Sequence, residues 1–249
     1  MIGTASVVAG LSLWQLVAAS GRLDATSFPT TSRIAGAGVG LLANRPFWSA
    51  LGHTAESWAL GLLIATVIAI PAGLMIGSNR FLFASTRVVV EFLKPIPVVA
   101  ILPLALLMFG TTIKMKLLLV AYGALWPLLI QTTYGAHDVD PVVADTARAF
   151  RLSYPRRLGF VVLPSAAPFV ATGLRLAAVH AFVITIVAEL VAGGQGLGLM
   201  MFMSDNALRY ADTYALAFIA GLLGLSLNFV LQRLERLSLH WHSSQRIEG

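Results

Sequence analysis

The chain has 249 residues, of which 57% are hydrophobic and only 11% charged, and its mean hydropathy is +0.82. A soluble domain carries about 25% charged residues, so this composition excludes an ordinary soluble protein and predicts a surface that largely faces lipid. The absence of cysteine excludes a disulfide framework and a thiolate metal site. The net charge of +6 is spread over many loops, which indicates orientation charge in a membrane protein and not a nucleic-acid patch.

Six segments are apolar enough to cross a bilayer, which takes a helix of about 20 mainly apolar residues. In chain order they are residues 3–21, 56–78, 88–110, 116–136, 167–191 and 212–232. We therefore predict an all-α polytopic membrane protein with six transmembrane helices, in which residues 1–249 form a single transmembrane domain. Ala18-Ala19-Ser20 resembles a signal-peptide cleavage site, but no Lys or Arg precedes it. We favour a retained span, and the missing basic start is also compatible with a natural start upstream of Met1.

The connection after the first span contains residues 34–43, which are predicted to form a short interfacial helix. The orientation follows from the Lys and Arg residues of the loops, because positive residues are enriched on the cytoplasmic side. With both termini inside, nine such residues lie in the inner loops and six in the outer loops. We therefore predict that both termini are cytoplasmic.

The third span, 88–110, contains Pro95, Pro97 and Pro103. Each proline lacks an N–H and frees a carbonyl one turn earlier, and in lipid such a carbonyl must find a protein partner or face water. We expect all three to break the helix and to line a pore, although neighbouring helices could seal a kinked span instead. Lys94, at the inner end of this span, either extends to the headgroups or lies near the exit path of an anionic substrate.

A polar, basic segment, residues 137–164, separates the fourth span from the fifth. Turn-forming and capping residues predict a helix that opens at about Val142, and Tyr154-Pro155 is predicted to stop it, because a residue before proline is disfavoured in the helical region. Phe150, Leu152 and Tyr154 would offer apolar contacts to a partner. On charge alone, an ordinary basic loop that only orients the protein is the simpler interpretation.

The spacing within this segment resembles the cytoplasmic coupling loop of bacterial ABC importer permeases, whose pattern is Glu-Ala-Ala, three residues, Gly, nine residues and Ile-x-Leu-Pro. Asp145-Thr146-Ala147 falls on Glu-Ala-Ala, Arg151 on the glycine, Val161 on the isoleucine and Leu163-Pro164 on the last two positions. Elsewhere, Pro95-Ile-Pro97 and Ala188-Glu189 are similar to motifs of the nitrate, sulfonate, taurine and bicarbonate subfamily.

The resemblance implies a type I ABC importer permease fold in a bacterial cytoplasmic membrane. It implies a homodimer that works with two ATP-binding ATPase subunits, an extracytoplasmic solute-binding protein and a small solute, such as a sulfonate, taurine, nitrate or bicarbonate. ATP and Mg²⁺ would bind the ATPase, so no cofactor, metal or catalytic residue is expected in this chain. The ATPase-coupling interface would comprise Asp145, Thr146, Ala147, Phe150, Arg151, Leu152, Ser153 and Tyr154.

Two features remain open in the sequence. Arg151 stands where the family has glycine, a residue used where the backbone needs a positive φ or where a partner approaches closely. Glu189 lies inside the fifth span, where ionisable groups are costly and usually face a bundle interior or a cavity. We predict that Glu189 belongs to a gate next to residues 193–196, and the alternative is a capped helix end in wet headgroups.

Arg175 also lies in the fifth span, but it cannot pair with Glu189 within one helix, because Glu189 comes fourteen positions later, about 21 Å along the helix. A stand-alone, proton-coupled transporter with Glu189 as the relay is the alternative function. An intramembrane enzyme is disfavoured, because no convergent catalytic groups are found.

Overall fold

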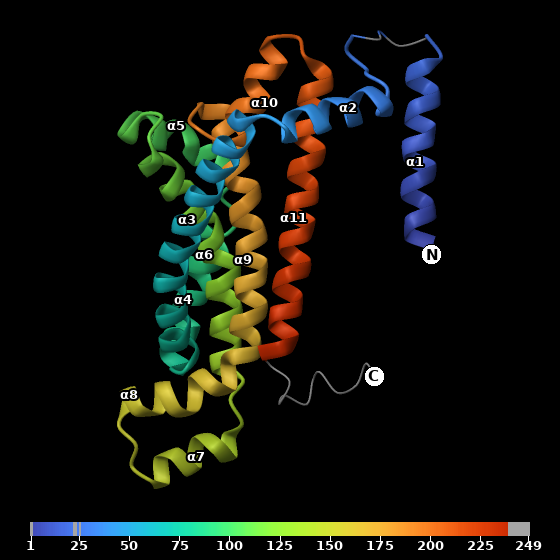
Figure 1. The fold of residues 1–249 in the computed structure, drawn as a ribbon. Helices are drawn as coiled ribbons and strands as arrows, with labels where there is room; N and C mark the ends of the chain where they lie inside the picture. Colours follow the sequence, from blue (N-terminus) through green and yellow to red (C-terminus); the bar gives the residue numbers. More distant parts are fainter. Residues whose placement is uncertain (1, 22–23, 25, 239–249) are drawn as a thin grey trace. The chain divides into compact units, whose positions relative to one another are not determined.

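The computed structural model describes residues 2–21, 24 and 26–238, and every regular element in this part of the chain is a helix. Figure 1 shows the elements, which are α1 Ile2–Ala19, α2 Thr31–Leu42, α3 Arg45–Gly77, α4 Arg80–Leu93, α5 Val98–Phe109, α6 Ile113–His137, α7 Pro141–Ala149, α8 Tyr154–Arg157, a π-helix Leu158–Val162, α9 Leu163–Ala192, α10 Leu197–Asn206 and α11 Tyr210–Ser238. The chain divides into two compact units, Met1–Glu56 with Ile186–Gly224 and Ser57–Thr185 with Leu225–Gly249.

Four helical segments among the described residues are long and apolar enough to cross a membrane. They are Arg45–Gly77, Ile113–His137, Tyr154–Ala192 and Tyr210–Ser238, and a fifth span is present if the bent pair α4 and α5 counts as one. The apolar helix Ala5–Ala19 is shorter than these, and at 1.5 Å per residue it falls short of a hydrocarbon core of about 30 Å. The all-helical fold is thus confirmed, whereas the count of six spans stays a prediction.

The predicted third span is split into α4 and α5, which meet at an angle of 82°. The break contains Pro95 and Pro97. The Lys94 amide donates to the Val90 carbonyl at the end of α4 (2.9 Å), and within the break the Ile96 amide donates to the Leu93 carbonyl (3.1 Å). Pro103, by contrast, lies inside α5. The predicted break at Pro103 is wrong, because one missing N–H within an otherwise bonded helix did not interrupt it.

The unit that contains α6 has a core of small residues where α3, α6 and α9 approach each other. Ala65, Ala124 and Ala177 are fully buried there. A Cβ at Gly73 would lie 2.7 Å from the Thr132 Cβ, and a Cβ at Gly77 would overlap the backbone of α6. Small residues allow such close helix contacts in membrane proteins, where van der Waals packing drives association.

The other unit has a core of larger apolar side chains. Phe47, Leu197 and Leu216 are almost completely buried, and α2 adds Ile34 to the same cluster. The predicted short helix after the first span is confirmed as α2, and the Thr30 hydroxyl caps it by accepting a hydrogen bond from the Arg33 amide (3.4 Å).

Candidate functional site

The polar segment between α6 and α9 contains two short helices, α7 and α8, which lie beyond the ends of α6 and α9 (Figure 1). The Asp140 carboxylate accepts a hydrogen bond of 2.7 Å from the Val142 amide at the start of α7. A carboxylate there satisfies a backbone N–H that has no partner within the helix. The structure therefore confirms the predicted opening of this helix to within one residue.

A residue with left-handed backbone geometry follows the end of helix α7. Arg151 has a φ of 54°, and the Leu152 amide donates to the Ala147 carbonyl across it (3.2 Å). This bonding pattern is a Schellman motif, in which glycine is the usual residue at the left-handed position. The glycine of the coupling-loop pattern thus coincides with a backbone requirement, which Arg151 meets at a conformational cost.

The prediction that Tyr154-Pro155 stops this helix is wrong. Helix α7 ends before Arg151, and Tyr154 begins α8 with Pro155 in its first turn. Proline is favoured there because its missing N–H would have no partner in any case. Ser153 precedes α8 without a side-chain cap.

Phe150 and Leu152 offer apolar surface on this segment. Phe150 is 77% exposed and Leu152 is 36% exposed. Tyr154 is also exposed, but its hydroxyl lies 3.2 Å from the Ser78 hydroxyl at the end of α3, and the Arg157 guanidinium lies over its ring. Phe150 and Leu152 are therefore the side chains best placed to enter a groove on a partner.

The three residues that match Glu-Ala-Ala differ in their surroundings. Ala147 is buried, whereas Asp145 and Thr146 are exposed on α7. The Thr146 hydroxyl donates to the Val142 carbonyl one turn earlier (2.7 Å), and Asp145 lines a cavity beneath the helix. Of the three, Ala147 thus packs the helix in place, Asp145 borders the cavity and Thr146 lies on the exposed surface.

Replacing Arg151 with glycine is expected to stabilise the end of α7. A left-handed conformation costs a residue with a Cβ about 1 kcal/mol or more, so local opening should become about fivefold rarer and exchange of the Leu152 amide hydrogen about fivefold slower. Hydrogen exchange followed by mass spectrometry measures this. Arg151→Ala removes the charge but keeps the Cβ, so equal protection in both variants would show that charge, and not backbone geometry, is the cause.

The pathway candidates of the third span lie around the break between α4 and α5. Lys94 caps the end of α4, and Pro97 precedes α5. No residue of α4 is buried, and Lys94 shares a small cavity with Arg87 and Glu91, which form an ion pair of 2.8 Å. The side of α4 that carries Arg87, Glu91 and Lys94 is therefore polar, although the predicted span around it is mainly apolar.

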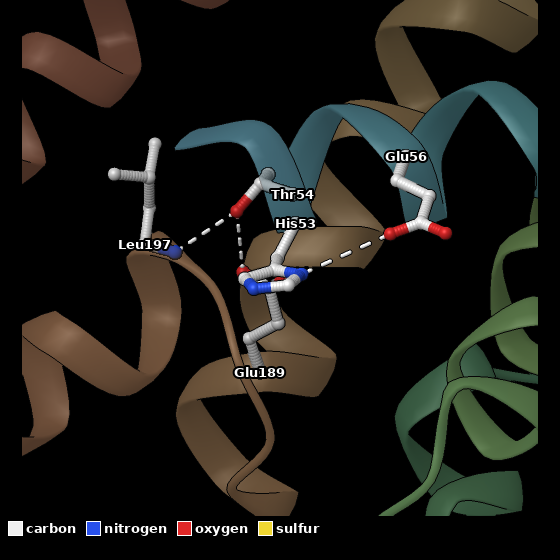
Figure 2. Close-up of polar contacts among 5 residues, drawn as sticks. All are labelled: His53, Thr54, Glu56, Glu189 and Leu197. Atoms are coloured by element: carbon white, nitrogen blue, oxygen red, sulfur yellow. Dashed lines mark hydrogen bonds and ion pairs between the residues drawn. The ribbon is translucent and has the colours of Figure 1, made fainter. Parts of the chain in front are cut away.

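Glu189 forms a buried hydrogen-bond network with Thr54 and the start of α10, and Figure 2 shows the bonds that join Glu189, Thr54 and Leu197. Its carboxylate accepts from the Thr54 hydroxyl of α3 (2.8 Å) and from the Gly198 amide (3.2 Å). The Thr54 hydroxyl in turn accepts from the Leu197 amide (2.9 Å), and Glu189 and Thr54 are both fully buried. The Leu197 and Gly198 amides at the start of α10 are thereby satisfied by oxygen acceptors.

Two glycines make room for this network. Gly196 has φ 148° and ψ −178°, a region that is populated almost only by glycine. A Cβ at Gly196 would overlap the Glu189 carboxylate, and a Cβ at Gly198 would overlap the Ile186 carbonyl. The segment before α10 can therefore close over the buried carboxylate only with glycine at these positions.

The close-up also shows His53, one residue before Thr54, with its ring directed toward Glu56 (Figure 2). The His53 Nδ1 and a Glu56 carboxylate oxygen are 3.8 Å apart, and both side chains are partly exposed. This is an ion pair only when the histidine is protonated, so it is a weaker contact than the buried network beside it.

The partner of Arg175 was missed by sequence reasoning. Its guanidinium Nε donates to the Glu235 carboxylate of α11 (2.8 Å), which also accepts from the Thr172 hydroxyl (2.6 Å). The Glu235 side chain is only 12% exposed. Arg175 and Glu235 are 60 residues apart, so no local spacing indicates the pair; the only signal is a carboxylate near the end of a predicted apolar span.

The sequence of this chain is similar to those of known proteins along most of its length. The family described as "Binding-protein-dependent transport system inner membrane component" matches residues 65–239. The bicarbonate transport system permease protein CmpB of Synechococcus elongatus is 31% identical over 76% of this chain and 68% of its own length. The taurine transport system permease protein TauC of Escherichia coli is 26% identical over 97% of this chain and 89% of its own length.

The fold also matches a solved structure. A chain of the inward-facing MetNI methionine ABC transporter superposes with a TM-score of 0.65 at 17% identity, over 79% of this chain and 95% of that chain. The family match covers most of the chain, including the coupling-loop segment and α9. The protein therefore belongs to the binding-protein-dependent transport system inner membrane components and is a permease subunit of an ABC importer.

Proposed function

We propose that two copies of this chain form the translocation pathway and that residues 137–164 of each copy face the cytoplasm and dock on an ATPase subunit. The observation that supports this most strongly is the pair of exposed apolar side chains, Phe150 and Leu152, directly after α7. Exposed apolar groups on an otherwise polar segment mark a protein interface. Two copies present two such segments, one for each ATPase subunit.

In this proposal the ATPase subunits bind ATP and Mg²⁺, and their closure moves the two coupling segments. The helices then alternate between inward-open and outward-open states around a fixed pathway. Glu189, which joins α3 to the start of α10, contributes to the outer gate. A solute-binding protein delivers the substrate at the outer face, near residues 193–212. Both chain termini are then cytoplasmic.

The substrate in this proposal is a small anion such as bicarbonate, nitrate, taurine or another sulfonate. The names of the relatives support this class, because CmpB is a bicarbonate permease, TauC is a taurine permease and a further relative is the nitrate import permease NrtB of Synechocystis. Lys94 and Arg87, beside the break between α4 and α5, would attract an anion to the pathway. The binding protein supplies most of the selectivity.

An uptake assay tests the proposal. Vesicles that contain this chain, its ATPase and its binding protein should accumulate one labelled anion only when ATP is present on the ATPase side. A protonophore should leave the initial uptake rate unchanged. Uptake that needs no ATP and collapses with the protonophore would instead establish the proton-coupled alternative.

A further inference from the structure

A polar cavity of about 750 Å³ lies between the coupling segment and the bundle. One wall comes from the end of α3, the start of α4 and the end of α6, and the other comes from α7 and the residues that follow α8. The residues that line it belong to one compact unit. Of the residues assigned to the coupling interface or to the translocation pathway, Asp145 alone is among those that line this cavity.

The cavity has an excess of positive charge. Arg80, the first residue of α4, and Arg157, the last residue of α8, line it from different walls. Among the described residues that line it, Asp145 is the only carboxylate. A guanidinium presents several N–H donors in a planar array that fits the oxygens of a phosphate. Two such groups at one cavity fit a phosphate-bearing anion.

The walls are held in place by contacts around the cavity. The ring of His137 stacks on that of Phe83 with centroids 4.1 Å apart and an interplanar angle of 4°. The His137 Nδ1 lies 3.3 Å from the Gly77 carbonyl, and Ser78 bonds to Tyr154 across the two walls. Because these contacts join both walls within the chain itself, the cavity is largely pre-formed, as small-molecule sites usually are.

Exposed aromatic side chains flank both arginines. Phe81, next to Arg80, is 76% exposed, and Phe160, three residues after Arg157, is 77% exposed. Aromatic residues concentrate at membrane–water interfaces, where arginine also reaches the headgroups. A soluble phosphate would have no use for these apolar neighbours, whereas a lipid has acyl chains beside its phosphate.

We propose that this cavity binds the phosphate of an anionic phospholipid of the cytoplasmic leaflet through Arg80 and Arg157. Basic pockets between helices on this side of a membrane suit such headgroups. The proposal rests on the orientation in the proposed function, with residues 137–164 in the cytoplasm. A bound headgroup would bridge the bundle and the coupling segment, so lipid composition would adjust how ATPase movement reaches the helices.

Native mass spectrometry of the full-length chain tests the site by counting retained lipids after incubation with phosphatidylglycerol or phosphatidylcholine. The wild type should retain phosphatidylglycerol preferentially. Each arginine near an anionic surface contributes about 1 kcal/mol, so Arg80→Gln with Arg157→Gln should weaken retention about 30-fold. The matched control is Arg233→Gln with Arg236→Gln, which removes the same charge from the end of α11 and should change little. The double variant Arg80→Lys with Arg157→Lys should keep most of the phosphatidylglycerol binding. That result would show that the site is still folded when both arginines are replaced.

Equal retention in the Arg80/Arg157 variant, equal loss in the Arg233/Arg236 variant, or no preference for phosphatidylglycerol would each overturn the proposal. The source of the phosphate is tested separately with inorganic phosphate in lipid-free detergent. If inorganic phosphate binds in an arginine-dependent manner and displaces the lipid, the cavity is a soluble-anion site instead. Failure of ATPase docking would not alter these lipid counts, so the two proposals can fail independently.

Discussion

Replacing Phe150 and Leu152 with aspartate is expected to abolish ATP-driven uptake while the chain still inserts and folds. Both side chains are exposed in the isolated chain, so the change costs the fold little. Burial of a Phe or Leu side chain in a partner contributes about 1.5–3 kcal/mol, so the loss of both should weaken ATPase docking at least about 100-fold. Co-purification of the ATPase and uptake in vesicles are the two measurements.

Leu237→Asp serves as the control, because Leu237 is about as exposed as Phe150, lies near the end of α11 and is outside residues 137–164. It should leave ATPase co-purification unchanged. If the Phe150/Leu152 variant still transports at a near-normal rate, the coupling segment is not the docking site. If both variants lose the ATPase, the effect is a general one of surface charge.

Gly196→Ala is expected to open the segment before α10 and to destabilise the protein strongly. The Gly196 backbone conformation costs a non-glycine residue about 1–3 kcal/mol, and the new Cβ would overlap the Glu189 carboxylate. Displacing that carboxylate leaves the Gly198 amide and the Thr54 hydroxyl without an acceptor, at about 1–3 kcal/mol each. Thermal unfolding in detergent should show a lower midpoint and a loss of protein recovered from membranes.

Gly193→Ala provides the comparison for this glycine. Gly193 also has a positive φ, of 68°, but a Cβ there meets nothing within 4 Å. The Gly193→Ala variant should therefore lose only the free energy that a left-handed backbone costs a residue with a Cβ, about 1–2 kcal/mol. Equal destabilisation by both substitutions would show that the contact with Glu189 contributes nothing.

Glu189→Gln separates a structural carboxylate from a proton relay. A carboxamide oxygen can still accept from Thr54 and from the Gly198 amide, so uptake should stay within about threefold of the wild type, a loss of less than 1 kcal/mol. A relay could not work with glutamine, because the amide does not exchange a proton. Complete loss of uptake in a well-folded Glu189→Gln protein would therefore contradict the structural role.

The long helices could be predicted from the sequence because their apolar runs exceed the thickness of a bilayer. Their boundaries could not, as α3 shows: it begins at Arg45, eleven residues before the predicted span at 56. Its first turns contain Arg45, His53 and Glu56, which lower local hydropathy, while Phe47 on the same turns is buried. A hydropathy window averages over such a helix and cannot detect one buried side.

In the candidate site, too, the sequence predicts local features but not contacts between distant residues. The spacing from Asp145 to Pro164 predicts a coupling segment because a motif is a local property, and the role of these residues stays a prediction. The conformation of Arg151 could be suspected only through the glycine that it replaces. The Arg175–Glu235 pair and the bond from Thr54 to Glu189 join residues far apart in the sequence. Tertiary packing selects such partners, so a single sequence contains no periodic signal for them.

The contact between α3 and α6 at Gly73 and Gly77 restricts how the molecule can move. The two helices are so close here that a Cβ at Gly77 would overlap the Thr133 carbonyl and a Cβ at Gly73 would overlap the Thr132 side chain. Packed interfaces of this kind are not continuously deformable. A transport cycle must therefore carry α3 and α6 as one body and place its bending elsewhere, and the proline-containing break at residues 94–97, which has few hydrogen bonds to lose, is the natural joint.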